Sequence, residues 1–363
     1  MSSSVPSTPS ARQNHPVNSV LELCRLVAIK IGLDVGLFEH LSKQDDKSVE
    51  VEDLASATGV EPRLLRRILR VLANTNNVIE SSPGYFRAND ACRHWTDPNV
   101  RATGEFHFEH TFQVILTLPT YLKENGYREP TDPTRTPWNI SKNTSLPFFD
   151  WLDSPGNETS RSNFDKSMTV GTMSHFWFEK TVSASQVLGS VDDPEAPLYV
   201  DIGGGLGEHA CKLHAAHPDL VGKLIVQDLP QSIHKSKQRK LPEKISLMEY
   251  NFFTPQPIQG AKNYYLRRVL HDWPDKEAIR ILQNQRMALR RDYSRILLNE
   301  KVVPDQGASP ADVVSDIIGM VVGGTERTET EWRQLVAQAG GLVVTDMMSF
   351  EECAEKIIVI ELE

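Results

Sequence analysis

From residue 197 onwards, the sequence alternates short apolar runs with polar segments of helix length. The apolar runs are "LYVDIG", "KLIVQDL", "ISLMEYN", "NYYLRRVL" and "RILLNEKVV", and a closing pair, "LVVTDMMSF" and "KIIVIELE", follows them. Runs that are apolar at nearly every position are typical of parallel strands covered by helices on both faces. We therefore predict an α/β domain with a doubly wound parallel sheet and an antiparallel pair at its end. Ligands of such sheets bind outside the carboxyl ends of the strands, where Asp228, His271 and Glu300 fall.

The first hundred residues have a helical pattern instead. A mostly apolar helix, "SVLELCRLVAIKIGLDVGLFEHL", has Ser19 as its N-cap and too few polar positions to face water. We expect it to be buried in its own domain or against a partner chain. A helix ending at Gly59, a second helix opened by Pro62 and a hairpin turning at Pro83 and Gly84 follow. This is the outline of a winged helix.

A winged helix raises the hypothesis of DNA binding. Its second helix carries four arginines that either read DNA or face solvent or a second subunit, namely Arg63, Arg66, Arg67 and Arg70. The formal charge of the chain is -9, and residues 1–100 contain 11 Lys and Arg against 12 Asp and Glu. A nucleic-acid binder concentrates positive charge, so this balance argues against DNA binding.

Several features concern the location of the protein. Residues 1–16 are polar, lack the apolar core of a signal peptide and are expected to be disordered. The sequence contains no run of about 18 apolar residues, so no membrane span is predicted. The cysteines lack metal-ligand spacing, so we expect free thiols in a reducing compartment, the cytoplasm. They are Cys24, Cys92, Cys211 and Cys353.

Residues 111–190 are expected to form a connecting segment. A helix runs up to Pro119, and a loop rich in Pro, Thr and Asn follows. The run "FDKSMTVGTMSHFWF" is dense in aromatic residues and Met, which pack in a core or line a ligand pocket.

The loop after the first predicted strand, "DIGGGLGEHACKL", indicates a nucleoside ligand. Gly203 and Gly205 let the backbone approach a ligand closely, but Glu208 stands where a dinucleotide-binding loop has its third glycine. Its charge at a helix N-terminus disfavours a pyrophosphate. Asp228 ends the second strand, where a carboxylate can bind ribose hydroxyls, and Asp201 could face an ammonium group. Together these residues favour S-adenosylmethionine, which has a cationic sulfur and no phosphate.

Three motifs in order, "DIGGGLG", "LHDWPD" and "GGTERTETEW", make the chain resemble the S-adenosylmethionine-dependent O-methyltransferases of the plant caffeate type, which have fungal members in secondary metabolism. The resemblance spans residues 17–363. It implies a mainly helical, winged-helix-like dimerisation domain at 17–110, a connecting and substrate-pocket segment at 111–190, and a Rossmann-like class I methyltransferase domain at 191–363. The N-terminal domain would then pair two subunits of a homodimer and bind no nucleic acid.

The motifs and the resemblance suggest roles for individual residues. Cofactor-binding positions are expected at Gly203, Gly205, Asp228, Asn251, Phe252, Arg267 and Thr172. Acceptor-binding positions are expected at Phe164, Met168 and, on a looser match to an Asn of the plant enzymes, His110. Phe176 and Met320 join an apolar set, with Met173 and Trp177, that fits a flat or greasy acceptor or a core. Two residues depart from the family pattern: Asn251 replaces an adenine-binding Asp, and Arg267 replaces a lysine.

The resemblance assigns His271 as the catalytic base and Glu300 and Glu326 as the acids that flank it. Only about one in a thousand phenols is ionised at pH 7, and a histidine with a pKa of about 6.5 is poised to take the proton. The second ring nitrogen needs an acceptor, for which Glu300 or Glu326 is suited. This scheme needs no metal. We assign Asp272 to capping of the helix that begins after Pro274.

A second hypothesis keeps the fold and the cofactor without methyl transfer. Some fungal proteins of this fold use S-adenosylmethionine, or only its positive charge, in dehydrations and pericyclic rearrangements. Such enzymes can dispense with a base, so the presence of His271, Glu300 and Glu326 favours methylation. His110 and Arg267 could instead polarise a carbonyl group, which keeps this pericyclase or dehydratase alternative open.

Overall fold

The computed structural model describes residues 16–171, 177–178, 184–350 and 355–363. Contacts divide these residues into two units. The first unit comprises the described residues up to Phe112 together with Pro155–Gly171, and the second comprises Gln113–Ser154 and the described residues after Gly171. The expected connecting segment, residues 111–190, is therefore shared between the two units.

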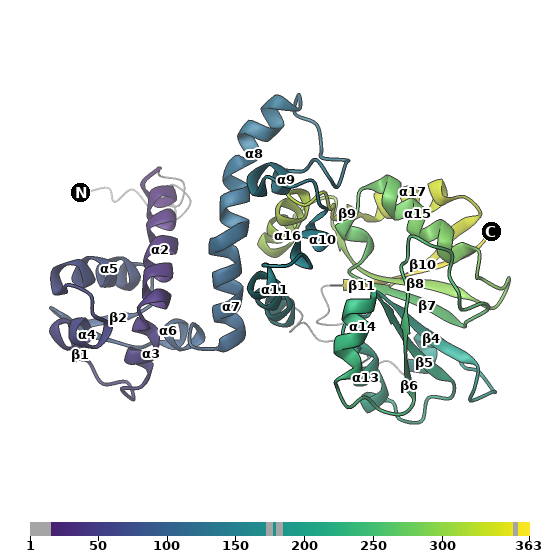
Figure 1. The fold of residues 1–363 in the computed structure, drawn as a ribbon, viewed down its shortest axis with the longest axis horizontal. Helices are drawn as coiled ribbons and strands as arrows, with labels where there is room; N and C mark the ends of the chain where they lie inside the picture. Colours follow the sequence, from purple (N-terminus) through teal and green to yellow (C-terminus); the bar gives the residue numbers. More distant parts are fainter. Residues whose placement is uncertain (1–15, 172–176, 179–183, 351–354) are drawn as a thin grey trace, which may run out of the picture. The chain divides into compact units, whose positions relative to one another are not determined.

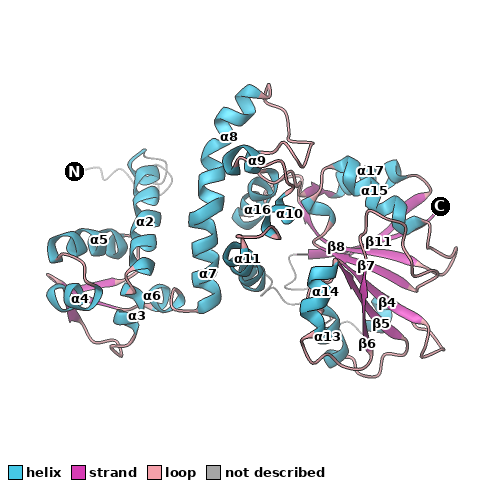
Figure 2. Ribbon diagram, in the orientation of Figure 1, coloured by secondary structure: helices cyan, strands magenta, loops and turns pink. Residues whose placement is uncertain are grey.

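The second unit is built on a largely parallel sheet (Figure 2). In spatial order the strands are β6 (Ile245–Glu249), β5 (Lys223–Asp228), β4 (Pro197–Ile202), β7 (Asn263–Arg267), β8 (Arg295–Val303), β11 (Glu355–Leu362) and β10 (Leu342–Ser349). The first five are mutually parallel, and β11 is antiparallel to both β8 and β10. A short strand, β9 (Arg327–Thr328), pairs with β8. The doubly wound sheet and its closing antiparallel pair are as predicted.

Each face of this sheet has its own core. Neighbouring residues of one strand point to opposite faces, so Tyr264 packs in one core and Tyr265 in the other. Figure 1 shows helices on both sides of the sheet. One core includes residues of α15 (Asp275–Arg286) and α17 (Glu329–Ala339), and the other includes residues of α12 (Ala184–Leu188) and α13 (Glu208–Ala216), beside which lies α14 (Pro230–Lys237). Burial on both faces explains why the strand sequences are apolar at nearly every position.

The second unit contains further helices that bear on the site. They are α8 (Phe112–Glu124), α9 (Pro137–Lys142), α10 (Phe148–Leu152), the 3-10 turn η2 (Leu270–Asp272) and α16 (Pro310–Met320). The prediction that a helix ends at Pro119 was wrong, because α8 continues through this residue to Glu124. Val114 and Tyr121, on either side of Pro119, are buried, and this packing offsets the backbone hydrogen bond that a proline lacks.

The first unit is mainly helical. Its elements are α2 (Pro16–Asp34), α3 (Leu37–Ser42), β1 (Val49–Glu50), α4 (Val51–Thr58), α5 (Pro62–Asn74), β2 (Ile79–Ser82), β3 (Tyr85–Arg87), α6 (Asp90–His94), α7 (Pro98–Phe106), the π-helical turn η1 (His107–Thr111) and α11 (Glu158–Gly171). As predicted, Gly59 ends α4, Pro62 opens α5, and β2 and β3 form a hairpin. Strands β1, β3 and β2 form one small sheet.

Helix α2 begins earlier than predicted. It begins at Pro16 and not after Ser19, so Ser19 lies inside the helix and Pro16 is not part of a disordered segment. Residues 1–15 lie outside the described part of the chain. Only one face of α2 is buried, since Ile29 is 0% exposed whereas Val20 is 60% exposed. No helix among the described residues is long and apolar enough to cross a membrane.

Candidate active site

The sheet of the second unit reverses its strand order between β4 and β7. From β4 the chain continues to β5 and β6 on one side, and then to β7 and β8 on the other. Ligands of doubly wound sheets bind at such a switch point, outside the carboxyl ends of the strands. Ile202 of β4 pairs with Leu266 of β7, so the glycine loop and His271, which follow these strands, lie at the switch point.

Two glycines turn the chain sharply after β4. Gly203 has a φ of 72°, in the left-handed region that favours glycine. A Cβ added at Gly204 would lie 2.8 Å from Cγ of Asp201, so no side chain fits there. The N–H groups of Gly203 and Gly204 both donate to the carbonyl oxygen of Gln227, at 2.8 and 3.1 Å. The loop is thus fixed to the end of β5, and only at Gly205 would a Cβ meet no atom within 4 Å.

Two carboxylates belong to this loop. Asp228 accepts hydrogen bonds from the backbone N–H groups of Gly205, at 2.8 Å, and Leu229, at 2.7 Å. Asp201 is buried, and burial together with the charge of Asp228 raises its pKa to about 7. Among the described residues, none forms a hydrogen bond to Oδ2 of Asp201. That oxygen remains as an acceptor for a cationic or N–H group of a ligand.

His271 lies in η2, just after the strand, and is held by one ring nitrogen. Its Nδ1 lies 3.1 Å from Oε1 of Glu326, and the hydroxyl of Ser315 donates to the same oxygen at 2.6 Å. The backbone N–H of Glu326 donates to Asp316 at 3.2 Å. Nε2 lies 3.5 Å from Oδ1 of Asp272, beyond hydrogen-bond distance. The ring is therefore oriented through Nδ1, and Nε2 is the atom that can exchange a proton.

The acids around His271 stabilise its protonated form. Burial favours the neutral ring, but the charges of Asp272 and Glu300 and the hydrogen bond to Glu326 outweigh burial and raise the pKa of His271 to about 9. Burial also opposes the ionisation of Glu326, but the hydrogen bonds from His271 and Ser315 lower its pKa to about 2. A pKa of about 9 favours the protonated ring at pH 7. It differs from the ordinary histidine pKa of about 6.5 that is expected from the sequence alone.

The two acids that flank His271 have different tasks. Glu326 is the acceptor for the ring, whereas Oε1 of Glu300 accepts from the backbone N–H groups of Val269 and Leu270, both at 3.0 Å. Glu300 is 0% exposed, and burial raises its pKa to about 7. Glu300 therefore holds the turn on which His271 stands and acts on the ring through its charge.

The motif "GGTERTETEW" packs against the back of this turn. The N–H of Thr325 donates to the carbonyl oxygen of His271 at 2.8 Å. A Cβ added at Gly324 would lie 2.5 Å from that oxygen. Only glycine lets the two backbones approach this closely, and the approach places Glu326 beside the ring.

Arg327 fixes the chain on the other side of His271. It is 2% exposed, donates to the carbonyl oxygen of Trp273 at 2.9 Å and to Asp275 at 2.7 Å. The prediction that Asp272 caps the next helix was wrong. Pro274 occupies the N-cap of α15 without a side-chain hydrogen bond, and the carboxylate of Asp272 faces His271 instead.

Three other predicted cofactor residues lie at or just after the carboxyl ends of strands of the same sheet. Arg267, at the end of β7, donates two hydrogen bonds of 2.8 Å to Glu355, so its guanidinium is engaged by the chain itself. Asn251 and Phe252 lie in the turn after β6, where Oδ1 of Asn251 accepts from the N–H two residues on, at 3.0 Å. Their contacts with the cofactor stay predictions.

The predicted acceptor residues of the first unit cluster around Phe106. The rings of His110 and Phe164 lie 5.0 and 5.5 Å from the ring of Phe106. His110 belongs to η1, and its Nε2 lies 2.9 Å from the hydroxyl of Ser160. Met168, on α11, is 44% exposed. Single π-helical turns are frequent at functional sites, but acceptor binding by these residues stays a prediction.

The remaining members of the predicted set lie elsewhere. Met320 is half-buried at the end of α16, in the second unit. Trp177 is 3% exposed and belongs to the core beside α12 and α13, which supports the core interpretation for this residue. Thr172, Met173 and Phe176 lie outside the described residues.

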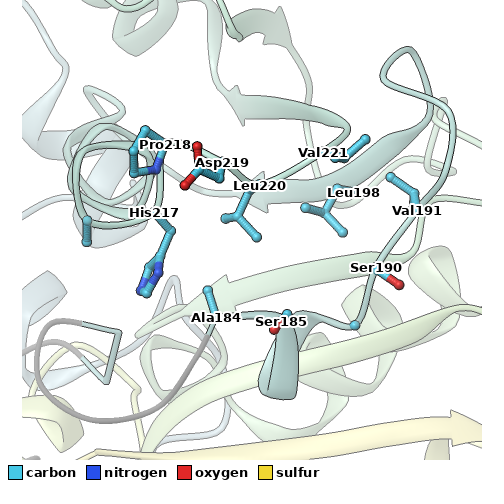
Figure 3. A pocket seen from close by; sticks show the side chains of 12 residues that line it. Ala184, Ser185, Ser190, Val191, Leu198, His217, Pro218, Asp219, Leu220 and Val221 are labelled. Carbon is cyan, nitrogen blue, oxygen red and sulfur yellow. The ribbon is translucent and has the colours of Figure 1, made fainter.

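A cavity of about 330 Å³ lies at the other end of the sheet (Figure 3). Its lining includes Ser185, Ser190, His217, Asp219 and Leu198. Leu198 stands at the amino end of β4, whereas the glycine loop follows the carboxyl end, so this cavity is separate from the switch point. Within the described ranges, no group of His, Cys, Asp or Glu side chains could hold a metal ion.

Sequence reasoning missed Ser315, Asp316 and Arg327. Ser315 and Asp316 precede Glu326 by 11 and 10 residues, on a helix that the motif "GGTERTETEW" follows. Polar residues in an otherwise apolar helix beside a catalytic motif were the available signal. Arg327 lies inside the motif, where its charge gave no indication of burial.

This sheet, with a glycine loop and a histidine at its switch point, has the architecture of a Rossmann-like nucleoside-binding domain. A family model described as an O-methyltransferase domain matches residues 158–341, and one described as an O-methyltransferase dimerisation domain matches residues 21–97. The chain belongs to the O-methyltransferase family. Membership confirms the predicted fold class, the enzyme class and S-adenosylmethionine as the cofactor.

Individual proteins are similar over most of the chain. O-methyltransferase lepI of Aspergillus flavus is 36% identical over 88% of this chain and 82% of its own length. Demethylsterigmatocystin 6-O-methyltransferase of Aspergillus parasiticus is 33% identical over 86% of this chain and 78% of its own. A solved structure of LepI with SAM has a TM-score of 0.86 and 32% identity, covering 98% of this chain and 91% of that one. A solved structure described as a pericyclic reaction enzyme gives the same values.

We predict that Gly324→Ala destabilises the protein by about 1–3 kcal/mol, because the added Cβ would overlap the carbonyl oxygen of His271. Urea denaturation gives the free energy of unfolding. Gly319→Ala, inside α16, is the control, since a Cβ there would lie 3.7 Å from its nearest neighbour, the backbone carbon of Gly324. Alanine at this helical position should raise the free energy of unfolding by about 0.5–1 kcal/mol. Equal effects of the two substitutions would show that the approach at Gly324 is not tight.

The stabilisation by the His271–Glu326 pair should depend on pH. Because the pKa of His271 is raised, its contribution to stability is complete below about pH 6.5 and is lost above about pH 9. Because the pKa of Glu326 is lowered, its contribution is complete above about pH 4.5 and is lost as the pH falls towards about 2. The wild type should therefore exceed Glu326→Gln in unfolding free energy most between about pH 4.5 and 6.5.

Urea denaturation at about pH 5.5 and about pH 9 tests this dependence, with a smaller difference expected at the higher pH. The control is Glu329→Gln, which removes an acid that is paired with Arg333 on the surface of α17. A difference between wild type and Glu326→Gln that is the same at both pH values contradicts the assignment.

Proposed function

We propose that the protein transfers a methyl group from S-adenosylmethionine to a hydroxyl of an aromatic or enolic secondary metabolite, with His271 as the general base and without a metal ion. The observation that carries this proposal is the 3.1 Å contact between Nδ1 of His271 and Glu326 at the switch point. A histidine held through one ring nitrogen presents the other for proton transfer, as general bases do.

The residues at the glycine loop fit this cofactor. When bound, S-adenosylmethionine supplies an electrophilic methyl group on a cationic sulfur. Asp228 already accepts two backbone N–H groups, but a carboxylate has about four acceptor sites, so it can also bind ribose hydroxyls. The unused oxygen of Asp201 suits the ammonium group of the amino acid tail. At Gly205 a Cβ would meet no atom within 4 Å, so the backbone there is open to the nucleoside.

His271 has to lose a proton before it can act as a base. Its pKa of about 9 keeps the ring protonated at pH 7. A positive charge close to an imidazolium lowers its pKa, so occupation of the site by a cation shifts His271 towards the neutral form. Neutral His271 takes the proton of the acceptor hydroxyl at Nε2, and the carboxylate of Glu326 stabilises the imidazolium that results.

The acceptor class rests on relatives and on composition. A relative that is 33% identical is named demethylsterigmatocystin 6-O-methyltransferase, a name that gives methyl transfer to an oxygen as its reaction. The aromatic groups around Phe106, with His110 and Phe164, suit a flat ring system. We therefore place polyketide-like phenols and enols first among the acceptors to be screened with this chain.

The second candidate function is a rearrangement or dehydration that uses the cofactor without methyl transfer. A solved structure described as a pericyclic reaction enzyme matches this chain with a TM-score of 0.86 and 32% identity. The raised pKa of His271 favours this candidate, because an imidazolium donates a hydrogen bond to a carbonyl group rather than accepting a proton.

The proposed location is the cytoplasm. Cys24, Cys92 and Cys211 are free thiols in the described part of the chain, as expected in a reducing compartment. Microscopy of the tagged chain tests this, and fluorescence confined to secretory compartments would contradict it.

His271→Ala should lower the rate of methyl transfer by about 10²–10⁴-fold, the contribution of a positioned general base, while binding of S-adenosylmethionine is retained. Mass spectrometry of the methylated product and of S-adenosylhomocysteine measures turnover, and calorimetry measures cofactor binding. His234→Ala, on the exposed side of α14, is the matched control. Product formed without stoichiometric S-adenosylhomocysteine would favour the rearrangement. Normal methyl transfer by His271→Ala would contradict the assignment of His271 as the general base.

We also predict a homodimer through the first unit. The dimerisation-domain match covers most of α2, whose exposed apolar residues are Val17, Val20, Leu23 and Val27. The double substitution Val20→Asp and Val27→Asp should convert dimer to monomer in sedimentation equilibrium, because burying unpaired carboxylates is unfavourable by several kcal/mol or more. Leu116→Asp, at an exposed position of α8, is the control. A dimer that survives the double substitution contradicts the assignment of this face.

A further inference from the structure

Ser315 is a polar residue of α16 to which neither the motifs nor the family match gives a role. Its hydroxyl donates to Oε1 of Glu326 at 2.6 Å, and that oxygen lies 3.1 Å from Nδ1 of His271. One carboxylate oxygen therefore receives both donors. Among the described residues, none forms a hydrogen bond to the other oxygen, Oε2. The orientation of the Glu326 carboxylate is thus set by Ser315 and His271 together.

The position of Ser315 is itself fixed by the way α16 is anchored. At the start of the helix, Ser309 and Asp312 form a reciprocal capping box. Lys301, on β8, lies 3.6 Å from Asp312 and so ties the first turn to the sheet. One residue after Ser315, the carboxylate of Asp316 accepts the backbone N–H of Glu326 at 3.2 Å. The helix therefore presents a hydroxyl and a carboxylate to the side chain and backbone of the same glutamate.

We propose that Ser315 is a positioning residue for methyl transfer, which holds the Glu326 carboxylate so that one chosen oxygen accepts from His271. This inference rests on the proposed role of His271 as the base. The hydroxyl does not touch the reacting atoms. The hydroxyl competes with Nδ1 of His271 for the same oxygen of Glu326. This competition limits how strongly His271 retains a proton.

The direction of this effect follows from the chemistry of the shared acceptor. A hydroxyl that donates to a carboxylate oxygen withdraws negative charge from it, and the second donor is then bound less strongly. Without Ser315 the oxygen should bind imidazolium more strongly, and the pKa of His271 should rise. The other charged groups that act on the ring are Asp272, Glu300 and Arg268. The hydroxyl of Ser315 donates to Glu326 and to none of these three. Their contributions remain in a Ser315 variant.

The test is the titration of His271 in the full-length protein, followed by NMR of ¹⁵N-histidine and assigned with His271→Gln. Ser315→Ala should raise the pKa of His271 by about 0.5 unit or more, which is part of the free energy of a hydrogen bond to a charged group. Ser315→Thr keeps the hydroxyl and should restore the wild-type titration. Ser315→Cys keeps the volume with a weaker donor and should give an intermediate value, which provides a second variant if alanine impairs folding.

Ser309→Ala is the matched control, because it removes the N-cap serine of the same helix, whose hydroxyl bonds Asp312 and not Glu326. It should lower stability and leave the titration of His271 unchanged. An unchanged titration in both Ser315→Ala and Ser315→Cys, or a shift of the same size in Ser309→Ala, overturns the inference. Because this readout is the protonation of a ring and not turnover, it remains decisive even if His271→Ala retains methyl transfer and the proposed function fails.

Discussion

The contact between His271 and Glu326 joins residues that are 55 positions apart, and the rest of the site is arranged to make it. Parallel pairing of β7 with β8 brings the turn that carries His271 beside the strand that leads into α16. The loop after α16 then returns to the same turn, where Thr325 bonds the carbonyl oxygen of His271 and Gly324 allows the backbones to meet. A change in the strand order, or in either backbone approach, would separate the two side chains.

The charge around this pair is strongly unbalanced. Asp272, Glu300 and Glu326 surround one imidazole, and Arg268 is the cation whose charge acts on all four groups. Such a group of buried acids is unfavourable by itself, because burial opposes each charge. The raised pKa values of Glu300 and Asp272 express this penalty, and the raised pKa of His271 offsets part of it. A site with this charge distribution attracts a cationic ligand. The cofactor of the family, S-adenosylmethionine, carries a positive charge on its sulfur.

Features that depend on local sequence were predictable. The strands of the second unit, the helix opened by Pro62 and the hairpin after it follow from apolar periodicity, proline and glycine, which act within a few residues. Side-chain partners were not predictable, because they depend on packing between distant segments. The capping role given to Asp272 was a local interpretation, whereas in the structure its carboxylate faces His271 and Arg327 fixes the start of the next helix. The pairing of Arg267 with Glu355 joins residues 88 positions apart, and no pattern in the sequence announces it.

The two candidate functions differ in the protonation state of a single ring. A protonated His271 can donate a hydrogen bond and polarise a carbonyl group, and a neutral His271 can accept the proton of a hydroxyl. The surrounding acids favour the protonated state, and a sulfonium beside the ring opposes it by Coulomb repulsion. In the proposed function, the distance between the cationic sulfur and His271 would therefore decide which chemistry these residues perform. A sulfur close to the ring would favour a base, whereas a more distant one would leave a hydrogen-bond donor.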